Sequence, residues 1–419
     1  MLEKLQNAWR IPELRKKILY TLGMLLVYRL LSVIPVPGMD LSQVSKVVSE
    51  FSILNFMSMM TGGSFERMTV MAMGITPYIN SSIILQLLTV AIPSLEKLAK
   101  EGPEGRKKIN EYTRYLTIGL AFIQAVGLVV AMRATSRSGW WWLVIIGICM
   151  AAGSALAMWI GERITENGVG NGVSLLIMAG IVSNLFNWFA AMITGVVGGT
   201  TNIFGVIIVL AILVAMIVVV TYVDMGERRI PVQYAKRMMG RKMYGGQSSH
   251  IPMKLNANGV MPLIFGYAIL QFPATLFAFF PTSGVNLWWT SFQNGFGYQI
   301  LLAVLVIAFT YFYSSITFDP VEISKNMQEN GGIVPGIRQG KATGDYLRRT
   351  SNRLTLFSAV FLAALAVVPT LLMQLVRPLG VSYTPFSASS VLIAVSVGIE
   401  TIRQIEAQMI MRHHQGFLG

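Results

Sequence analysis

Side chains that could carry out covalent, redox or metal chemistry are scarce in this sequence. Its single cysteine, Cys149, lies in an apolar block, so neither an intramolecular disulfide nor a cysteine metal site is expected. The histidines His250, His413 and His414 lack the spacing to Cys or Glu that metal motifs show. Residues 102–108 read GPEGRKK and do not match the phosphate-binding loop of nucleotide hydrolases. We expect no cofactor, no metal and no enzymatic nucleophile.

The residues with suggestive spacing are aliphatic. Ile79 and Ile83 are four residues apart, as are Ile177 and Ile181, so each pair would share one helix face. Isoleucine is stiff because it branches at Cβ. On spacing alone, packing against lipid or a neighbouring helix is the simpler explanation.

These pairs must be positioned by elements that cross a membrane. Of the 419 residues, 54% are hydrophobic and 12% are charged, whereas a soluble domain carries about 25% charged residues. A helix needs roughly 20 apolar residues to span a bilayer. The first block ends without a signal-peptidase pattern and is interpreted as a retained span. Ten spans are predicted, at residues 18–34, 70–92, 115–132, 140–160, 173–193, 204–223, 260–280, 298–318, 354–376 and 383–405.

The basic residues orient these spans. The net charge is +14. If the ten spans alternate in direction, 27 of the 33 lysines and arginines lie on the same side of the membrane as both termini. Since basic loops stay in the cytoplasm, both termini are predicted to be cytoplasmic. Loops 224–259 and 319–353 are long, basic and on that side. Five spans in residues 1–193 and five in 194–419 permit an inverted repeat, because an odd number reverses the second half.

Ionisable side chains are nearly absent from the middle of the spans. Arg29 is close enough to the outer end of the first block to snorkel, and Glu400 and Arg403 lie near the inner end of the last. An ion-coupled pathway usually carries such groups at mid-membrane. A secondary transporter of small solutes remains the alternative suggested by the five-plus-five division.

Motifs along the whole chain specify the family further. They are Gly74–Leu88, Gly168–Ser174, Ile230–Arg237, Gln271–Thr275, Pro335–Arg338 and Arg353–Leu356. In this order and topology they resemble the SecY/Sec61-alpha family, the pore subunits of Sec protein translocases. The resemblance implies an all-α polytopic membrane protein whose ten transmembrane helices form two five-helix halves with inverted pseudo-symmetry around a central hourglass pore. It places an aliphatic ring at the waist, formed by Ile79, Ile83, Ile177, Ile181, Ile269 and Ile393.

Two further features follow from the resemblance. An outer plug is expected at about residues 51–69, although an interfacial helix would have the same character. A lateral gate is expected between the second and third spans and the seventh and eighth, although simple helix kinks are the alternative. The plug residues are Ile53, Leu54, Phe56, Met57, Met60, Gly62 and Gly63. The gate residues are Pro77, Gln86, Gln271 and Pro273.

The function implied is passage of unfolded polypeptides across the bacterial plasma membrane, with lateral release of signal peptides and other apolar segments into the lipid. The implied partners are small SecE-like and SecG-like membrane subunits, the SecA ATPase, the ribosome, nascent chains and membrane lipids. Gln339 stands where the family pattern has proline. Docking of SecA or the ribosome is expected at Arg228, Arg229, Arg241, Lys242, Lys254 and Arg338, although these residues could serve orientation alone.

Overall fold

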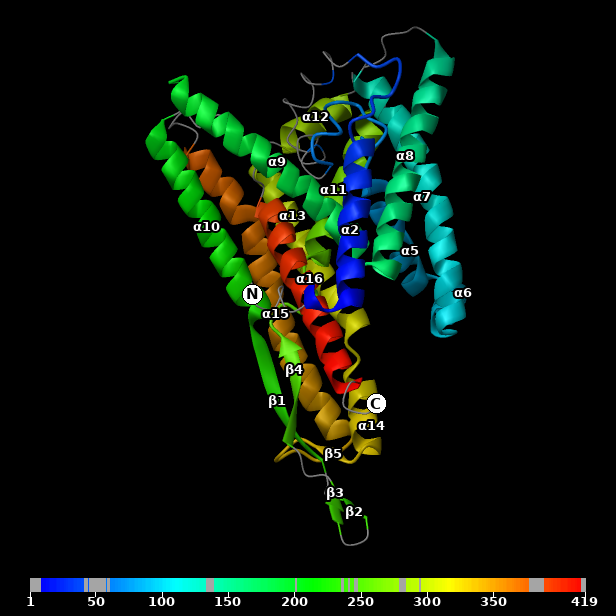
Figure 1. Ribbon diagram of the computed structural model, residues 1–419, viewed down its shortest axis with the longest axis vertical. Coiled ribbons are helices and arrows are strands. Elements are labelled where there is room, and N and C mark those ends of the chain that lie inside the picture. The colour runs from blue at the N-terminus through cyan, green and yellow to red at the C-terminus, as the bar shows by residue number, and fades with distance from the viewer. Residues whose placement is uncertain are drawn as a thin grey trace.

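The chain folds as a helical bundle with a small sheet beyond one end (Figure 1). The computed structural model describes residues 9–40, 44, 58, 61–132, 139–199, 202–234, 237–239, 242–244, 248–278, 284–293, 295–376 and 388–415. The long helices are α2 (Pro12–Leu31), α5 (Thr76–Ala91), α7 (Pro103–Met132), α8 (Trp140–Asn167), α9 (Gly172–Val197), α10 (Ile203–Met225), α11 (Met261–Ala278), α13 (Phe296–Thr317), α15 (Lys341–Val376) and α16 (Ala388–Gln415). The short helices are α6 (Pro93–Lys100), α12 (Gly284–Gln293) and α14 (Pro320–Glu329).

Each of the ten predicted spans overlaps one long helix. Among the described residues, six helices are long and apolar enough to cross a membrane on their own, namely α7, α8, α9, α10, α13 and α15. The pair α5 and α6 makes a seventh span if taken together, although it bends by 102° at Ile92. The others, α2, α11 and α16, coincide with the first, seventh and tenth predicted spans.

Several predicted boundaries are wrong in informative ways. Residues 70–75 form turns, so the second span begins only at Thr76, with Gly74 at φ 53° just before it. Pro77 therefore lies in the first turn of α5, where proline is tolerated, and does not interrupt the span as predicted. The division between halves moves past residue 193, because α9 continues to Val197. Loop 319–353 contains α14 and the first turns of α15.

The two halves repeat one packing pattern. In the first, α7 packs on α8, α5 on α7, α8 on α9, and α2 on both α8 and α9. In the second, α13 packs on α15, α11 on α13, α15 on α16, and α10 on both α15 and α16. When the spans are numbered from the start of each half, the same five pairs of helices are in contact in both halves. Helix α16 touches α9, and α11 touches α5 and α7, and these contacts join the halves.

The predicted basic loops are not irregular but build a sheet. Strand β1 (Glu227–Tyr234) pairs antiparallel with β4 (Ser248–Lys254) and also with β5 (Gly332–Ile333), so both loops contribute to one structure. We call β1 and β4 the docking hairpin. A second pair, β2 (Arg237–Met239) and β3 (Lys242–Tyr244), lies beyond it. The start of α2 and the end of α16 lie toward the sheet end of the bundle (Figure 1), where Leu14 packs with Ile405.

Candidate functional site

The predicted ring residues come from four helices that are distant in the sequence. Five of them are buried in one apolar cluster: Ile79 and Ile83 of α5, Ile177 and Ile181 of α9, and Ile393 of α16. The sixth, Ile269 of α11, is half-buried and packs against the same cluster. Because α5 and α9 belong to the first half and α11 and α16 to the second, the cluster closes the interface between the halves.

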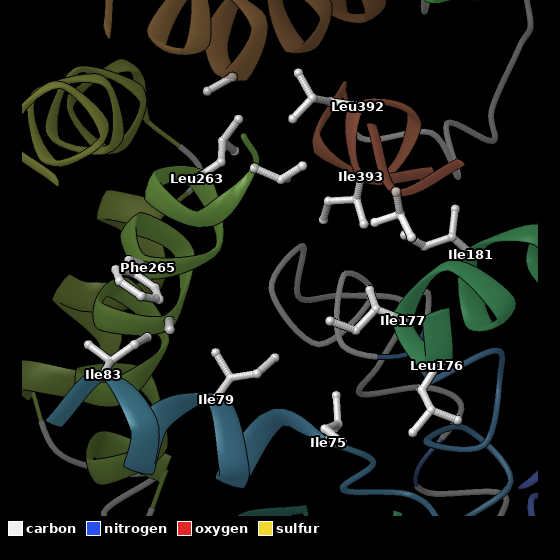
Figure 2. Packing of buried hydrophobic residues seen from close by; sticks show 14 of the residues in the cluster. Ile75, Ile79, Ile83, Leu176, Ile177, Ile181, Leu263, Phe265, Leu392 and Ile393 are labelled. Atoms are coloured by element: carbon white, nitrogen blue, oxygen red, sulfur yellow. The ribbon is translucent and has the colours of Figure 1, made fainter. Parts of the chain in front are cut away.

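The ring side chains face one another. Figure 2 shows Ile79, Ile177 and Ile393 pointing from three helices toward a common interior. The five buried members expose between 1% and 8% of their surface. An isoleucine side chain has no group that water can solvate, and its Cβ branch limits rotation. These side chains are therefore stiff and offer water no hydrogen-bond partner, which are the properties that the predicted ring requires.

The end of the predicted plug is anchored on the helix that carries two ring residues. The peptide nitrogen of Gly63 donates to the carbonyl of Ser58 at 2.8 Å. Asn184 of α9 donates to the same carbonyl through Nδ2 at 3.2 Å. Gly62 and Gly63 have φ angles of 68° and 80°, a region that glycine adopts without strain. The remaining predicted plug residues, Ile53, Leu54, Phe56, Met57 and Met60, lie outside the described residues.

Arg29 joins this anchor. Its guanidinium donates to the carbonyl of Ala179, which lies on α9 between the two ring positions of that helix. The guanidinium also fills the space that a Cβ on Gly62 would need. The prediction that Arg29 snorkels to the outer surface is therefore wrong. A half-buried cation is stabilised by the nearby carbonyl acceptor and does not need to reach water.

Gly62→Ala is expected to lower the melting temperature and to raise ion leakage through the resting channel. A methyl group at this position collides with the Arg29 guanidinium, and we expect the shift of that group to weaken its bond to Ala179. The matched control is Gly63→Ala, where the nearest atom, Asn184 Oδ1, is 3.7 Å from the new Cβ. Both substitutions carry the backbone cost of about 1 kcal/mol for alanine at positive φ, so their difference isolates the collision.

Thermal unfolding and a flux assay in vesicles measure the two effects. If Arg29 packs against Gly62 as described, Gly62→Ala should lower the melting temperature and raise the leakage more than Gly63→Ala does. Adding Arg29→Ala to each should reduce the difference between them, because the obstacle is then gone. Equal damage from both alanines would mean that only backbone strain matters here.

The predicted lateral gate lies where α11 meets α5 and α7. Pro273 lies inside α11, as predicted, and is half-buried. Gln86 is exposed, and its Nε2 donates to Ser82 one turn back on its own helix at 3.5 Å. The side chain of Gln271 lies outside the described residues. The seam is thus present, with one proline weakening the hydrogen bonding of one of its helices.

The predicted docking residues surround the docking hairpin. Arg228, Arg229 and Lys254 are exposed, and Arg229 pairs with Glu227 at 2.6 Å. The hydrogen bond from Arg229 lowers the pKa of the Glu227 carboxyl. Ile230 and Val232, each 1% exposed, lie on the face of β1 opposite Arg229 and belong to an apolar cluster with Val334 and Leu347. Arg241 lies outside the described residues, as does the side chain of Lys242 on β3.

Arg338 is exposed on a well-defined turn beside the hairpin. Gly336 turns the chain at φ 81°, and Thr343 Oγ1 donates to the Arg338 carbonyl at 2.8 Å. Gln339 reaches back to the carbonyl of Gly332 in β5 at 3.4 Å. The loop that lacks the expected proline is therefore tied to the sheet by the glutamine side chain.

The described part of the chain shows no cluster of metal-binding side chains. No group of three or more His, Cys, Asp or Glu side chains there could hold a metal ion. His250 lies in β4 and is exposed, and Cys149 is a half-buried free thiol.

Two polar contacts of the site were not predicted. Arg29 was noted in the sequence but not paired with Ala179, 150 residues away. Asp224, the last acidic residue before the docking hairpin, binds Ser396 of α16, 172 residues away. The only signal for either was an ionisable residue at or near a span end, which does not identify the partner.

Comparisons with known proteins agree with this geometry. The SecY family model matches residues 69–402. The chain is similar to the protein translocase subunit SecY of Streptomyces galbus, with 41% identity over 443 residues that cover 100% of each chain.

Two solved structures share the fold. One is a SecY protein whose plug domain is described as stabilising the closed state of the translocation channel and maintaining a membrane seal; it has a TM-score of 0.67 and 20% identity, covering 94% of this chain and 92% of the other. The second is Sec61 in the canine ribosome–channel complex from the endoplasmic reticulum, with a TM-score of 0.63 and 19% identity, covering 94% and 93%. The resemblance inferred from the motifs is confirmed.

Proposed function

This chain belongs to the SecY family, and from that premise we propose that it is the protein-conducting subunit of a membrane translocase. Unfolded polypeptides pass between its two halves through the ring of isoleucines. The observation that carries the proposal is the ring itself, to which both halves contribute. It has no group that would bind a passing chain, yet at rest it excludes water.

A transporter of small solutes would need a different centre. Such proteins place polar or charged groups near the bilayer midplane, where they bind the substrate and the coupling ion. Among the described residues, no Asp, Glu, Lys or Arg is fully buried, and the side chains of the predicted ring are all isoleucines. Nothing in that cluster favours a solute site, and the comparisons give no support to a transporter.

The route out to the lipid is proposed at the seam between α11 and the α5–α7 pair. These contacts join the halves on one side, while α16 and α9 join them elsewhere. Separation at the seam would open the ring sideways without breaking the α9–α16 contact. Apolar signal peptides and membrane segments would then partition into the bilayer, because burial in lipid is favourable for them.

The plug and the partners complete the proposal. The segment ending at Gly62 and Gly63 would seal the outer side at rest, held by Asn184 and Arg29. The chain would catalyse no covalent reaction, and SecA or a ribosome docked at the hairpin would supply the driving force. SecE-like and SecG-like subunits would pack on its exposed apolar helix faces. The setting proposed is the bacterial plasma membrane, with both termini in the cytoplasm, on the side of the sheet.

Cross-linking of a stalled secretory chain tests the path. A photoreactive residue replacing Ile83 is expected to form an adduct with the chain in transit, because Ile83 is a ring member. Val90 lies two turns further along α5 and is 58% exposed, so it reports the mouth on the sheet side. Ile207 on α10 is 58% exposed on a helix outside the ring and serves as the negative control. Adducts at Val90 but none at Ile83 would refute the path through the ring.

A further inference from the structure

The root of the docking hairpin is held by one acidic side chain. Asp224 lies in the last turn of α10, three residues before β1. Its Oδ1 accepts from Asn256 Nδ2 at 2.8 Å, just past the end of β4. Its Oδ2 accepts from Ser396 Oγ of α16, and its backbone carbonyl accepts from Arg403 Nη2 at 2.9 Å. Asp224 thus makes one hydrogen bond to the segment that follows β4 and two hydrogen bonds to α16.

The network extends from the hairpin into the second half. Asn256 is 5% exposed, and its Oδ1 accepts from Ser358 Oγ of α15 at 3.0 Å. Gly226 accepts from the peptide nitrogen of Leu255 at 2.9 Å and closes the hairpin at its base. Buried polar groups of this kind are costly to leave unpaired, so the network resists being pulled apart one bond at a time.

The α16 end of this network is close to the ring. Ser396 lies three residues after Ile393, and Arg403 follows seven residues later, so the three side chains lie along one stripe of the helix. Helix α16 also packs on α9, which carries Ile177 and Ile181. A displacement of the hairpin root would therefore be passed to a ring helix through Asp224.

We propose that Asp224 is a positioning residue that couples the docking hairpin to the ring, by holding the hairpin root and α16 as one mechanical unit. This rests on the proposed function, since it supposes that a partner docks at the hairpin and that the ring gates the channel. The role belongs to the geometry of the carboxylate, whose two oxygens point to two different elements. Without the carboxylate, α10 would still pack on α16 and Arg403 would still bond to the Asp224 backbone, but Asn256 at the returning end of the hairpin would lose its link to α16.

The test uses Asp224→Ala in the complete translocase, reconstituted in vesicles. Three quantities are measured: SecA binding affinity, the increase in ion conductance when SecA docks, and translocation. We expect affinity within about twofold of wild type, since the exposed docking residues are unchanged. The conductance response and translocation are expected to fall at least fivefold. Ser396→Ala should reduce the conductance response and translocation similarly. The double variant should show no larger loss than either single variant, because the same link is lost in each case.

Two variants serve as matched controls. In Asp224→Asn the carboxamide oxygen still accepts from Asn256 while its nitrogen donates to Ser396, so the response should stay within twofold of wild type. Asn258→Ala removes a bond from the same root to Thr310 of α13, at 2.9 Å, and leaves α16 attached. It should also respond normally. These controls separate the link to α16 from the general stability of the root.

Two results would overturn the coupling role. One is a normal conductance response in Asp224→Ala. The other is loss of SecA binding and of thermal stability in proportion to the response, which would make the network a brace only. Failure of the proposed function is distinguishable, because it would show in wild type as the absence of an adduct between a stalled chain and position 83.

Discussion

Replacing Ile177 with asparagine is expected to raise the ion conductance of the resting channel by about tenfold or more. Ile177 is 2% exposed and points toward Ile79 and Ile393 (Figure 2). The barrier depends on a dry constriction, and an amide there gives water a group to hydrate and removes the Cβ branch. A barrier lowered by about 1.4 kcal/mol corresponds to tenfold in rate. Planar-bilayer recording of the purified protein, without substrate, measures it.

The matched control is Ile160→Asn on α8. Ile160 is 1% exposed and belongs to the same apolar cluster, but it is not a predicted ring member. Burying an amide there should lower stability by about 1–3 kcal/mol and leave the conductance near wild type. Ile177→Val keeps the branched apolar character and should seal. Equal leakage from both asparagine variants would mean that conductance reports damaged packing and not the ring.

The spans were predictable because one physical requirement dominates them. A helix in lipid must be apolar over roughly 20 residues, and it satisfies its own backbone hydrogen bonds. Their predicted orientation rests on the basic loops, which are expected in the cytoplasm. The boundaries were less accurate, as at Pro77, because an apolar run does not distinguish the turn at 70–75 from the helix that follows it.

The sheet in the two long basic loops is not predicted, although the sequence carries a signal for it. Residues Arg229 to Gln233 alternate polar or small outward residues with Ile230 and Val232, which are buried. Such alternation is typical of a half-buried strand. A strand of eight residues is too short to form an apolar run of roughly 20 residues, so hydropathy alone does not indicate it.

The contacts between distant residues could not be read from one sequence. Asp224 and Ser396 are 172 residues apart, and nothing near either residue specifies the other. The repeat of packing between the halves was likewise invisible, because it is a property of neighbouring helices and not of similar residues. The ring is predicted only from the motifs of a known family. The spacing of Ile79 and Ile83 alone is equally typical of ordinary packing.

Arg338→Glu is expected to reduce SecA-driven translocation at least tenfold while the fold stays intact. The residue is exposed, so its replacement disturbs no packing. Its backbone is held by the turn at Gly336 and by Thr343, so the side chain is presented from a fixed position. A positive charge presented in this way attracts an acidic partner surface, and its reversal turns attraction into repulsion. Translocation of a labelled precursor into vesicles measures the loss.

Charge reversal at a second exposed arginine separates docking from general electrostatics. Arg349→Glu makes the same change in net charge on the exposed side of α15, away from the turn that holds Arg338. It should reduce translocation by no more than about threefold, and added salt should reduce the difference from wild type, since exposed charges are screened over about 10 Å. The Arg338 variant should stay impaired in salt, because a specific contact is lost as well as a long-range attraction. Equal losses in both variants would show that the partner senses only the basic surface, whereas a selective loss assigns docking to the turn beside the hairpin whose root Asp224 holds.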